Sequence, residues 1–157
     1  FLCDTFGSEN TPVLGQGFIK AFRVHHSDPT DITRHGFVET NGKNCLISLP
    51  VFIFAVLFLN FGDFFQLFLG IFMTALTLAV FGTNQFHKWA HTAELKGFPV
   101  VLQKWGVILS KENHNVHHAA PHDKYYCITT GWLNPLLTKI KFFDTIKWIF
   151  KKNEYGK

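Results

Sequence analysis

The sequence predicts an all-α, multi-pass membrane protein in which a transmembrane helical hairpin carries a cytosolic, histidine-rich helical cap. Three observations lead to this fold class. The chain has two long apolar runs, it has no Lys or Arg between residues 45 and 86, and all nine of its histidines lie outside the two runs. The runs predict the hairpin, the charges orient it, and the histidines place the chemistry on one side of the membrane.

The composition sets the limits for this prediction. The chain has 157 residues, of which 47% are apolar, 17% are charged and 19 are Phe. Its length suits a single domain over residues 1–157. So many apolar and so few charged residues exclude a disordered chain and argue against an ordinary soluble enzyme. The net charge is only +4 and no basic stripe is present, which argues against a nucleic-acid partner.

The apolar runs, residues 46–61 and 64–81, predict transmembrane helices at about residues 45–61 and 64–86, joined by a tight turn. A bilayer core needs roughly 20 helical residues, and the first run is slightly short, with Pro50 in its first turn, where proline is tolerated. The positive-inside rule then places residues 1–44 and 87–157 in the cytosol. A buried hairpin in a soluble protein or a re-entrant loop is the alternative, but neither run shows a polar face.

The segments around the hairpin give weaker signals. The first 44 residues are polar and punctuated by Gly and Pro, and they begin with Phe1 rather than Met, so we expect an N-terminal portion to be missing. Residues 92–136 suggest short helices and loops. Residues 137–152 alternate bulky apolar residues with Lys and predict one helix, which either lies in the membrane interface or packs on the body.

The histidines fall into groups whose spacing is typical of ligands on helices. His87 and His91 share a helix face just past the second apolar run, if that helix continues to residue 91. A second helix would place three histidines on one side, with Pro121 ending it and leaving the last histidine on a loop. The candidate metal ligands are His25, His26, His35, His87, His91, His114, His117, His118 and His122.

Nine imidazoles exceed the roughly four ligands that one zinc ion takes, and they suit two metal ions with open positions. Imidazole binds Zn, Cu, Fe and Ni alike, so the ligands alone do not choose the metal. The surroundings of the histidines indicate the metal instead, because histidines at the end of a lipid-embedded hairpin face alkyl or acyl chains. Removing hydrogen from such chains requires a metal that activates O2, so we expect two irons, O2 as co-substrate and no catalytic residue beyond the ligands.

Other classes of protein remain open at this point. A zinc-dependent membrane hydrolase would need an acid/base Glu near three histidines, and the sequence has no His-Glu-x-x-His. A non-enzymatic membrane adaptor would carry these histidines as vestigial or regulatory groups. Desaturation and hydroxylation can share one oxidant, and they differ in how the substrate carbon is held.

Several strings of residues recur in order in a known family. They are residues 4–8, 22–26, 33–35, 39–42, 83–91, 117–122 and 126–134. Over the chain from Asp4 to about Phe143 they resemble the Kua/CarF-type lipid desaturase family, and most closely its plasmanylethanolamine desaturase branch. The resemblance implies a membrane fatty-acid-desaturase-like fold and histidine ligation of a di-iron centre by the nine residues named above.

The resemblance also implies an activity and its partners. The expected reaction is O2-dependent desaturation of the sn-1 O-alkyl chain of an ether phospholipid to a vinyl ether, with an acyl-lipid desaturase or hydroxylase as the alternative. Electrons would come from a carrier such as cytochrome b5 with its NADH-dependent reductase, or from a bacterial counterpart. The expected location is the endoplasmic reticulum membrane in a eukaryote and the cytoplasmic membrane in a bacterium.

The chain departs from the family pattern around two of its motifs. The family usually has a further histidine before the block that begins at Asp4, and an Asp where this chain has Gly36. An Asp beside a ligand histidine often orients it, so that task would pass to Asp28, Asp31, Glu39 or a backbone carbonyl.

Overall fold

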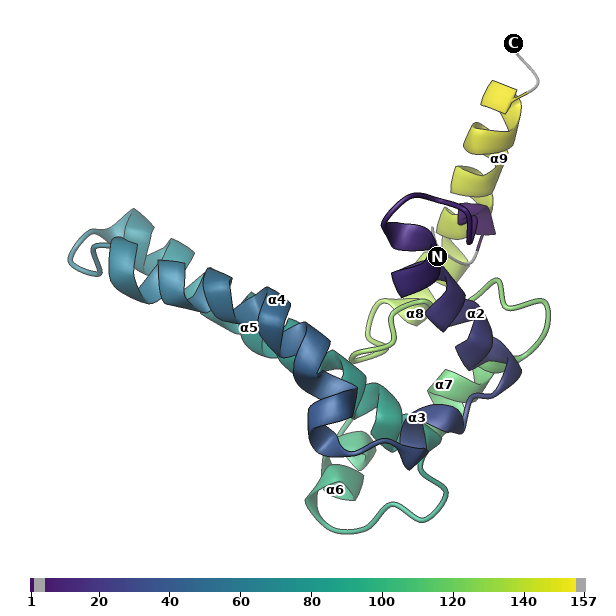
Figure 1. Cartoon of the computed structure of the whole chain (residues 1–157), viewed down its shortest axis with the longest axis horizontal. Helices are drawn as coiled ribbons and strands as arrows, with labels where there is room; N and C mark the ends of the chain where they lie inside the picture. Colours follow the sequence, from purple (N-terminus) through teal and green to yellow (C-terminus); the bar gives the residue numbers. More distant parts are fainter. Residues whose placement is uncertain (2–4, 155–157) are drawn as a thin grey trace.

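The computed structural model describes residue 1 and residues 5–154, and within these ranges every regular element is a helix. The all-α prediction is therefore confirmed for the described chain, whereas Asp4 lies outside it. Figure 1 shows three parts: a long arm formed by two antiparallel helices, a body of short helices at the base of the arm, and a C-terminal helix that projects from the body in another direction.

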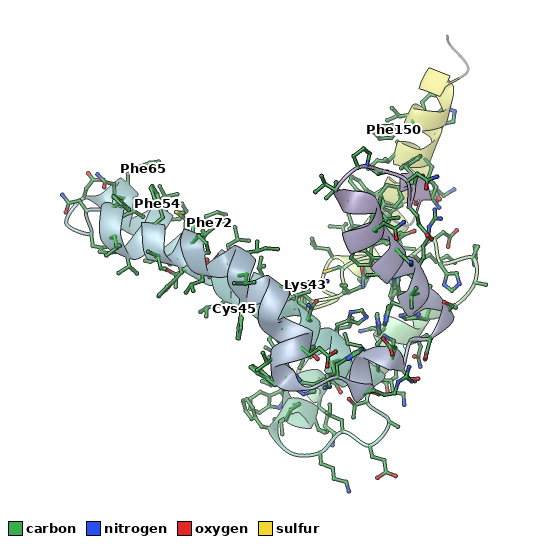
Figure 2. All side chains as sticks on the ribbon, in the orientation of Figure 1. Lys43, Cys45, Phe54, Phe65, Phe72 and Phe150 are labelled. Carbon is green, nitrogen blue, oxygen red and sulfur yellow. The ribbon has the colours of Figure 1, made fainter. Side chains whose placement is uncertain are left out.

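The arm consists of α4 (Phe37–Phe58) and α5 (Phe64–His91). Both helices are long and apolar enough to cross a membrane, and only 17% and 11% of their most apolar windows are buried. Figure 2 shows Phe54, Phe65 and Phe72 projecting from the arm. A hairpin in the core of a soluble protein would be covered on most sides, so the structure does not support that alternative.

The turn of the hairpin lies where the sequence predicts it. The Asp63 carboxylate caps α5 by accepting a hydrogen bond from the Gln66 backbone N–H at 2.9 Å, and the Gln66 side chain accepts one from the Asn60 N–H at 2.8 Å. Gly70 lets the turn fold back closely, because a Cβ there would lie 2.6 Å from the Phe61 ring. The second helix continues to His91, beyond the predicted end at about residue 86, so His87 and His91 do share one helix.

The first helix differs from the prediction, since it begins at Phe37 and ends at Phe58 rather than covering residues 45–61. Its polar first turns are helical because their amides bond to α5. The Asn41 Nδ2 donates to Gln85 Oε1 at 3.0 Å, and the Asn44 Nδ2 donates to the Val80 carbonyl at 2.7 Å. In return, the Asn84 Nδ2 donates to the Thr40 carbonyl at 2.9 Å. These contacts fix the base of the arm.

The body is built from short helices on either side of that base. A π-helical turn, η1 (Gly15–Ile19), leads into α2 (Lys20–Ser27), and α3 (Asp31–Arg34) precedes the arm. The helices α6 (Phe98–Lys104) and α7 (Lys111–His118) follow it. The Lys88 ammonium of α5 donates to the His35 carbonyl and ties the α3–α4 link to the arm.

The C-terminal segment forms two helices, α8 (Asn134–Lys139) and α9 (Phe142–Glu154). The prediction of one helix over residues 137–152 is wrong here, because Lys141 adopts a left-handed backbone with φ 52° and breaks the helix. Asn134 anchors the first of the two, since its side chain bonds to both backbone groups of Cys127 at 2.9 and 3.1 Å. The second projects from the body (Figure 1).

Candidate metal centre

Five histidines from three helices meet in one cluster. The helix α2 contributes one, α5 contributes two, and α7 contributes two. They are His25, His87, His91, His114 and His118, and one ligand atom from each lies within 4.8 Å of all the others. We call this set the five-histidine cluster. The two pairs on α5 and α7 are spaced i, i+4, which is why each pair points to one side of its helix.

The nitrogens of the cluster face one another rather than backbone or solvent. The Nε2 of His91 lies 3.0 Å from that of His25, 3.2 Å from that of His87 and 2.7 Å from that of His114. The Nε2 of His118 lies 3.1 Å from those of His25 and His114. A neutral imidazole has only one N–H, so a single hydrogen on His91 cannot serve three such contacts.

A shared cation would account for this arrangement. Two nitrogens that are each about 2.1 Å from one ion lie about 3.0 Å apart when their bonds meet at a right angle and about 3.4 Å apart in a tetrahedron. The observed separations of 2.7 to 3.2 Å match the right angle better. The cluster is therefore able to hold a metal ion.

The surroundings keep these imidazoles neutral and able to bind a metal. Burial, aided by the charge of neighbouring histidines, lowers the pKa of His25 to about 4, of His118 to about 3 and of His114 to about 2. Each group is therefore unprotonated at pH 7 and offers a lone pair. The Nδ1 atoms of His114 and His118 are buried without a hydrogen-bond partner among the described residues.

A second group of histidines adjoins the first. The His26 ring lies 4.9 Å from that of His117 and 4.8 Å from that of His122, and it lies 5.0 Å from the ring of His118 in the five-histidine cluster. The His117 Nδ1 lies 2.9 Å from the Lys124 carbonyl, which orients the ring by accepting its N–H. The second group therefore lies directly beside the five-histidine cluster.

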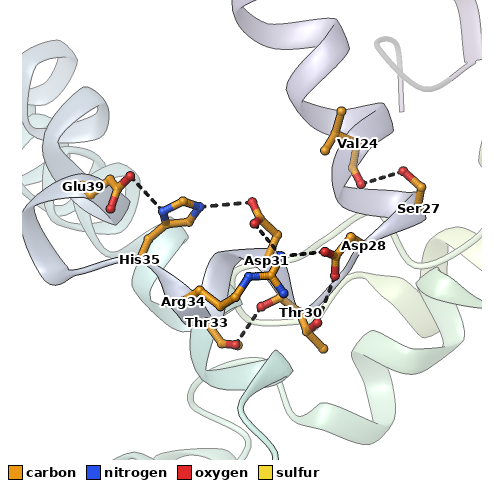
Figure 3. Close-up of polar contacts among 9 residues, drawn as sticks. All are labelled: Val24, Ser27, Asp28, Thr30, Asp31, Thr33, Arg34, His35 and Glu39. Carbon is orange, nitrogen blue, oxygen red and sulfur yellow. Dashed lines mark hydrogen bonds and ion pairs between the residues drawn. The ribbon is translucent and has the colours of Figure 1, made fainter.

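His35 is the one predicted ligand that the structure does not bring to either group. Its Nε2 lies 3.1 Å from the Asp31 carboxylate and its Nδ1 lies 2.8 Å from the Glu39 carboxylate, as Figure 3 shows. These carboxylates raise the pKa of His35, mainly through the Asp31 hydrogen bond. Two of the three acidic residues expected to orient it, Asp31 and Glu39, do contact it. Its assignment as a ligand stays a prediction.

The two histidine groups lie beside two cavities. A cavity of about 580 Å³ lies between α2 and the base of the arm and reaches His25 and His87. We call it the arm-side cavity. A smaller one, of about 320 Å³, reaches His26 and His122 and is also lined by Tyr126. The larger cavity is the one that adjoins the apolar arm.

Sequence reasoning missed the groups that support the second histidine group. The Tyr126 hydroxyl donates to the His122 carbonyl at 2.7 Å, and its ring lies 5.1 Å from that of His117. Tyr126 belongs to a string that marked the resemblance, but nothing in the spacing indicated this role. Lys20 and Lys43, which line the arm-side cavity, were missed too, because nothing in the sequence indicated that they share a cavity.

Comparison with known proteins gives a consistent result. A family model described as a lipid desaturase domain matches residues 1–155. The chain is 49% identical over 142 residues to plasmanylethanolamine desaturase from Myxococcus xanthus, covering 90% of this chain and 50% of that protein. It is 48% identical over 149 residues to plasmanylethanolamine desaturase 1 from Mus musculus, covering 92% and 55%.

A more distant relative carries a different name. The chain is 36% identical over 149 residues to fatty acid desaturase 4, chloroplastic, from Arabidopsis thaliana, covering 94% of this chain and 44% of that protein. The chain thus spans about half the length of the curated relatives it matches. No solved structure matches it.

Proposed function

Since the chain belongs to the lipid desaturase family, we propose that it desaturates the sn-1 O-alkyl chain of an ether phospholipid, converting plasmanylethanolamine to the vinyl ether plasmenylethanolamine. The chain is 49% and 48% identical to two relatives named plasmanylethanolamine desaturase, which supports this substrate. The observation that carries the proposal is the convergence of the histidines beside a cavity at the base of an apolar arm.

Two irons are the metals that this site supports best. The five-histidine cluster would hold one, and His26, His117 and His122 would contribute to the second, beside His118. When bound, the irons supply the O2-derived oxidant that breaks unactivated C–H bonds. The chain keeps the buried imidazoles neutral and places the arm-side cavity against His25 and His87, so that an alkyl chain can reach the centre.

The overall reaction requires a partner that donates electrons. Two hydrogens leave adjacent carbons of the alkyl chain, and O2 is reduced to two waters with two further electrons and two protons. Side chains cannot supply these electrons, so a carrier must. We expect cytochrome b5 with its NADH-dependent reductase, or a bacterial counterpart.

The proposed topology places one domain across and beside a membrane. The arm crosses the bilayer twice, and the histidine-bearing body lies on the cytosolic side, where Lys and Arg are concentrated. The membrane would be that of the endoplasmic reticulum in a eukaryote and the cytoplasmic membrane in a bacterium. This geometry would let the reacting end of a phospholipid reach the histidines while its chains stay in the bilayer.

One observation favours a second candidate of the same build, an acyl-lipid desaturase or hydroxylase. The relative named fatty acid desaturase 4 is still 36% identical over most of this chain. The metal centre could serve either substrate, because the position of the chain in the cavity decides which carbon reacts.

The test is a lipid assay in cells that make alkyl-ether phospholipids but no plasmalogens. Acid releases a long-chain aldehyde from vinyl ethers, so we expect aldehyde from wild-type protein and none from the His114→Ala, His118→Ala double variant. Asn115→Ala, an exposed change on the same helix, is the matched control and should retain activity. New double bonds or hydroxyls in acyl chains, without aldehyde, would favour the second candidate.

A further inference from the structure

We infer that the arm-side cavity binds the phosphoethanolamine head group of the lipid, with Lys43 and Lys20 holding the phosphate and Glu39 holding the ammonium. All three residues line this cavity together with His25 and His87. The inference rests on the proposed function and assigns its head-group site. It also makes the cavity selective for a zwitterionic phospholipid.

The chemistry of the substrate places head group and metal centre in one cavity. The carbons that become the vinyl ether are attached through the ether oxygen to glycerol, and the phosphate is attached to the other end of glycerol. The phosphate is therefore only a glycerol length away from the reacting bond. Of the two cavities described above, the arm-side one reaches the five-histidine cluster, so it must hold both.

The position of Lys43 suits a phosphate at the membrane surface. It is the last basic residue before the apolar stretch of the arm, and its side chain is exposed. Figure 2 shows it at the base of the arm, beside the body. No ion pair among the described residues involves Lys43. Its ammonium can therefore bind a phosphate oxygen without breaking a contact within the protein.

Lys20 lines the same cavity from α2, whereas Lys43 lines it from α4. Its Nζ lies 3.4 Å from the Gln16 side-chain oxygen, which uses one of its three N–H donors and leaves two for a ligand. Two ammonium groups from different helices can thus share one phosphate. Residues Phe22 and Ile32 supply apolar walls to the same cavity.

The order of charges along α4 matches the order of groups in the lipid. Glu39 lies four residues before Lys43, on the same helix face and about 6 Å further from the apolar stretch. In phosphoethanolamine the ammonium likewise lies beyond the phosphate, at the far end of a two-carbon bridge. The Glu39 Oε1 contacts His35 at 2.8 Å, and its second oxygen remains for the ammonium (Figure 3).

The other carboxylate of the cavity is already neutralised. Asp31 accepts from Arg34 at 2.7 Å and contacts His35 at 3.1 Å, so both of its oxygens are engaged. The cavity therefore presents two cations and one accessible anion, which is the complement of a phosphate and an amine. A phosphoglycerol head group would leave Glu39 without a cationic partner.

The test is internal competition in vesicles that contain two ether lipids at once, using the intact protein. The ratio of the two vinyl-ether products reports relative kcat/KM and does not depend on how much protein is folded. With ethanolamine and phosphoglycerol head groups as the pair, Glu39→Gln should shift the product ratio towards phosphoglycerol by about five- to tenfold. With alkyl-acyl-glycerophosphoethanolamine and phosphate-free alkyl-acylglycerol as the pair, Lys43→Gln should lower the preference for the phospholipid about tenfold.

Matched controls come from an exposed loop outside the cavity. Lys96→Gln and Glu94→Gln remove the same charges at positions that are 84% and 85% exposed, and both product ratios should stay at the wild-type value. Ratios that are also unchanged in Lys43→Gln and Glu39→Gln would overturn the inference. So would strong inhibition by micromolar soluble phosphoethanolamine that stays undiminished in Lys43→Gln and Glu39→Gln, because the free compound would then bind through other residues.

A binding measurement separates this inference from the proposed function. Native mass spectrometry of the protein released from nanodiscs counts bound diacyl phosphatidylethanolamine, which needs no turnover. If wild type makes no vinyl ether but retains this lipid in a Lys43-dependent way, the function fails and the head-group site stands. Equal retention by wild type and Lys43→Gln would overturn the site, whatever the activity.

Discussion

The arm and the body of this protein are held together by different physical means. The arm is two helices joined by a turn of a few residues, and most of its apolar surface faces outward. The body brings together residues that are far apart in the sequence, such as His25 and His118, which are separated by 93 positions. The arm therefore depends on its surroundings, whereas the body depends on contacts within the chain.

The body has little apolar core to hold those distant residues. Its buried apolar side chains include Ile19, Ile108 and Leu109, while His114, His117 and Asn134 are buried polar groups. Neutral histidine nitrogens that face one another contribute little stability by themselves. A metal ion would join three helices at one point, so its binding energy would also be folding energy for the body.

The largest expected effect is that of metal removal. An iron chelator should loosen the body and leave most of the arm helical, because the arm's own candidate ligands, His87 and His91, lie at its base, beyond residues 50–58 and 64–80. A ligand at 1,000 times its Kd contributes about 4 kcal/mol to stability, so the loss should be of that order. Hydrogen exchange is the measurement: α2 and α7 should lose protection, while residues 50–58 and 64–80 should not. Equal loss in both parts would show that arm and body unfold as one unit.

A smaller effect is expected where the two parts meet. The Asn41 side chain is buried and donates to the amide oxygen of the half-buried Gln85, so Asn41→Ala removes a hydrogen bond worth about 1 kcal/mol. The base of the arm should exchange faster, and iron affinity should fall because α5 also carries His87 and His91. Val38→Ala, an exposed change on the same helix, is the control. Unchanged iron affinity would show that the body fixes α5 by itself.

The same contrast explains what the sequence could predict. Local patterns were sufficient for the arm: apolar runs predicted two helices, and the i, i+4 spacing of His87 and His91 predicted that α5 continues past the apolar run. The early start of α4 was missed because its polar first turns are stabilised by hydrogen bonds from Asn41 and Asn44 to α5, which spacing does not reveal. Lys141 was missed because a left-handed break without Gly gives no signal.

Long-range contacts limited what could be predicted of the site. Grouping of the histidines predicted that they are metal ligands, and eight of the nine converge. The division into two groups depends on how three helices pack, so the sequence could not give it. The separation of His35 has a local cause instead, since the carboxylates of Asp31 and Glu39, each four residues away, engage both of its nitrogens.

The smallest expected effect concerns α9, which belongs to neither part. Trp148 and Phe150 on this helix are 61% and 49% exposed, and Lys147 adjoins them. Figure 2 shows Phe150 on the projecting helix, well away from the arm. If α9 lies in the membrane interface, its apolar residues are in lipid and its lysines face the head groups.

The double change Trp148→Ser, Phe150→Ser distinguishes an interfacial α9 from a packing helix. Burying each ring in lipid is worth about 1.5–3 kcal/mol, which is small beside the insertion of two membrane-spanning helices. The variant should therefore stay in the membrane through carbonate extraction, yet a fluorescent probe on α9 should become more accessible to an aqueous quencher. Activity should change less than twofold, because α9 contributes no histidine. If the rings instead pack on the body, the quencher accessibility of the probe should be the same with and without lipid. The variant should then lose thermal stability even in detergent, where no bilayer contributes to stability.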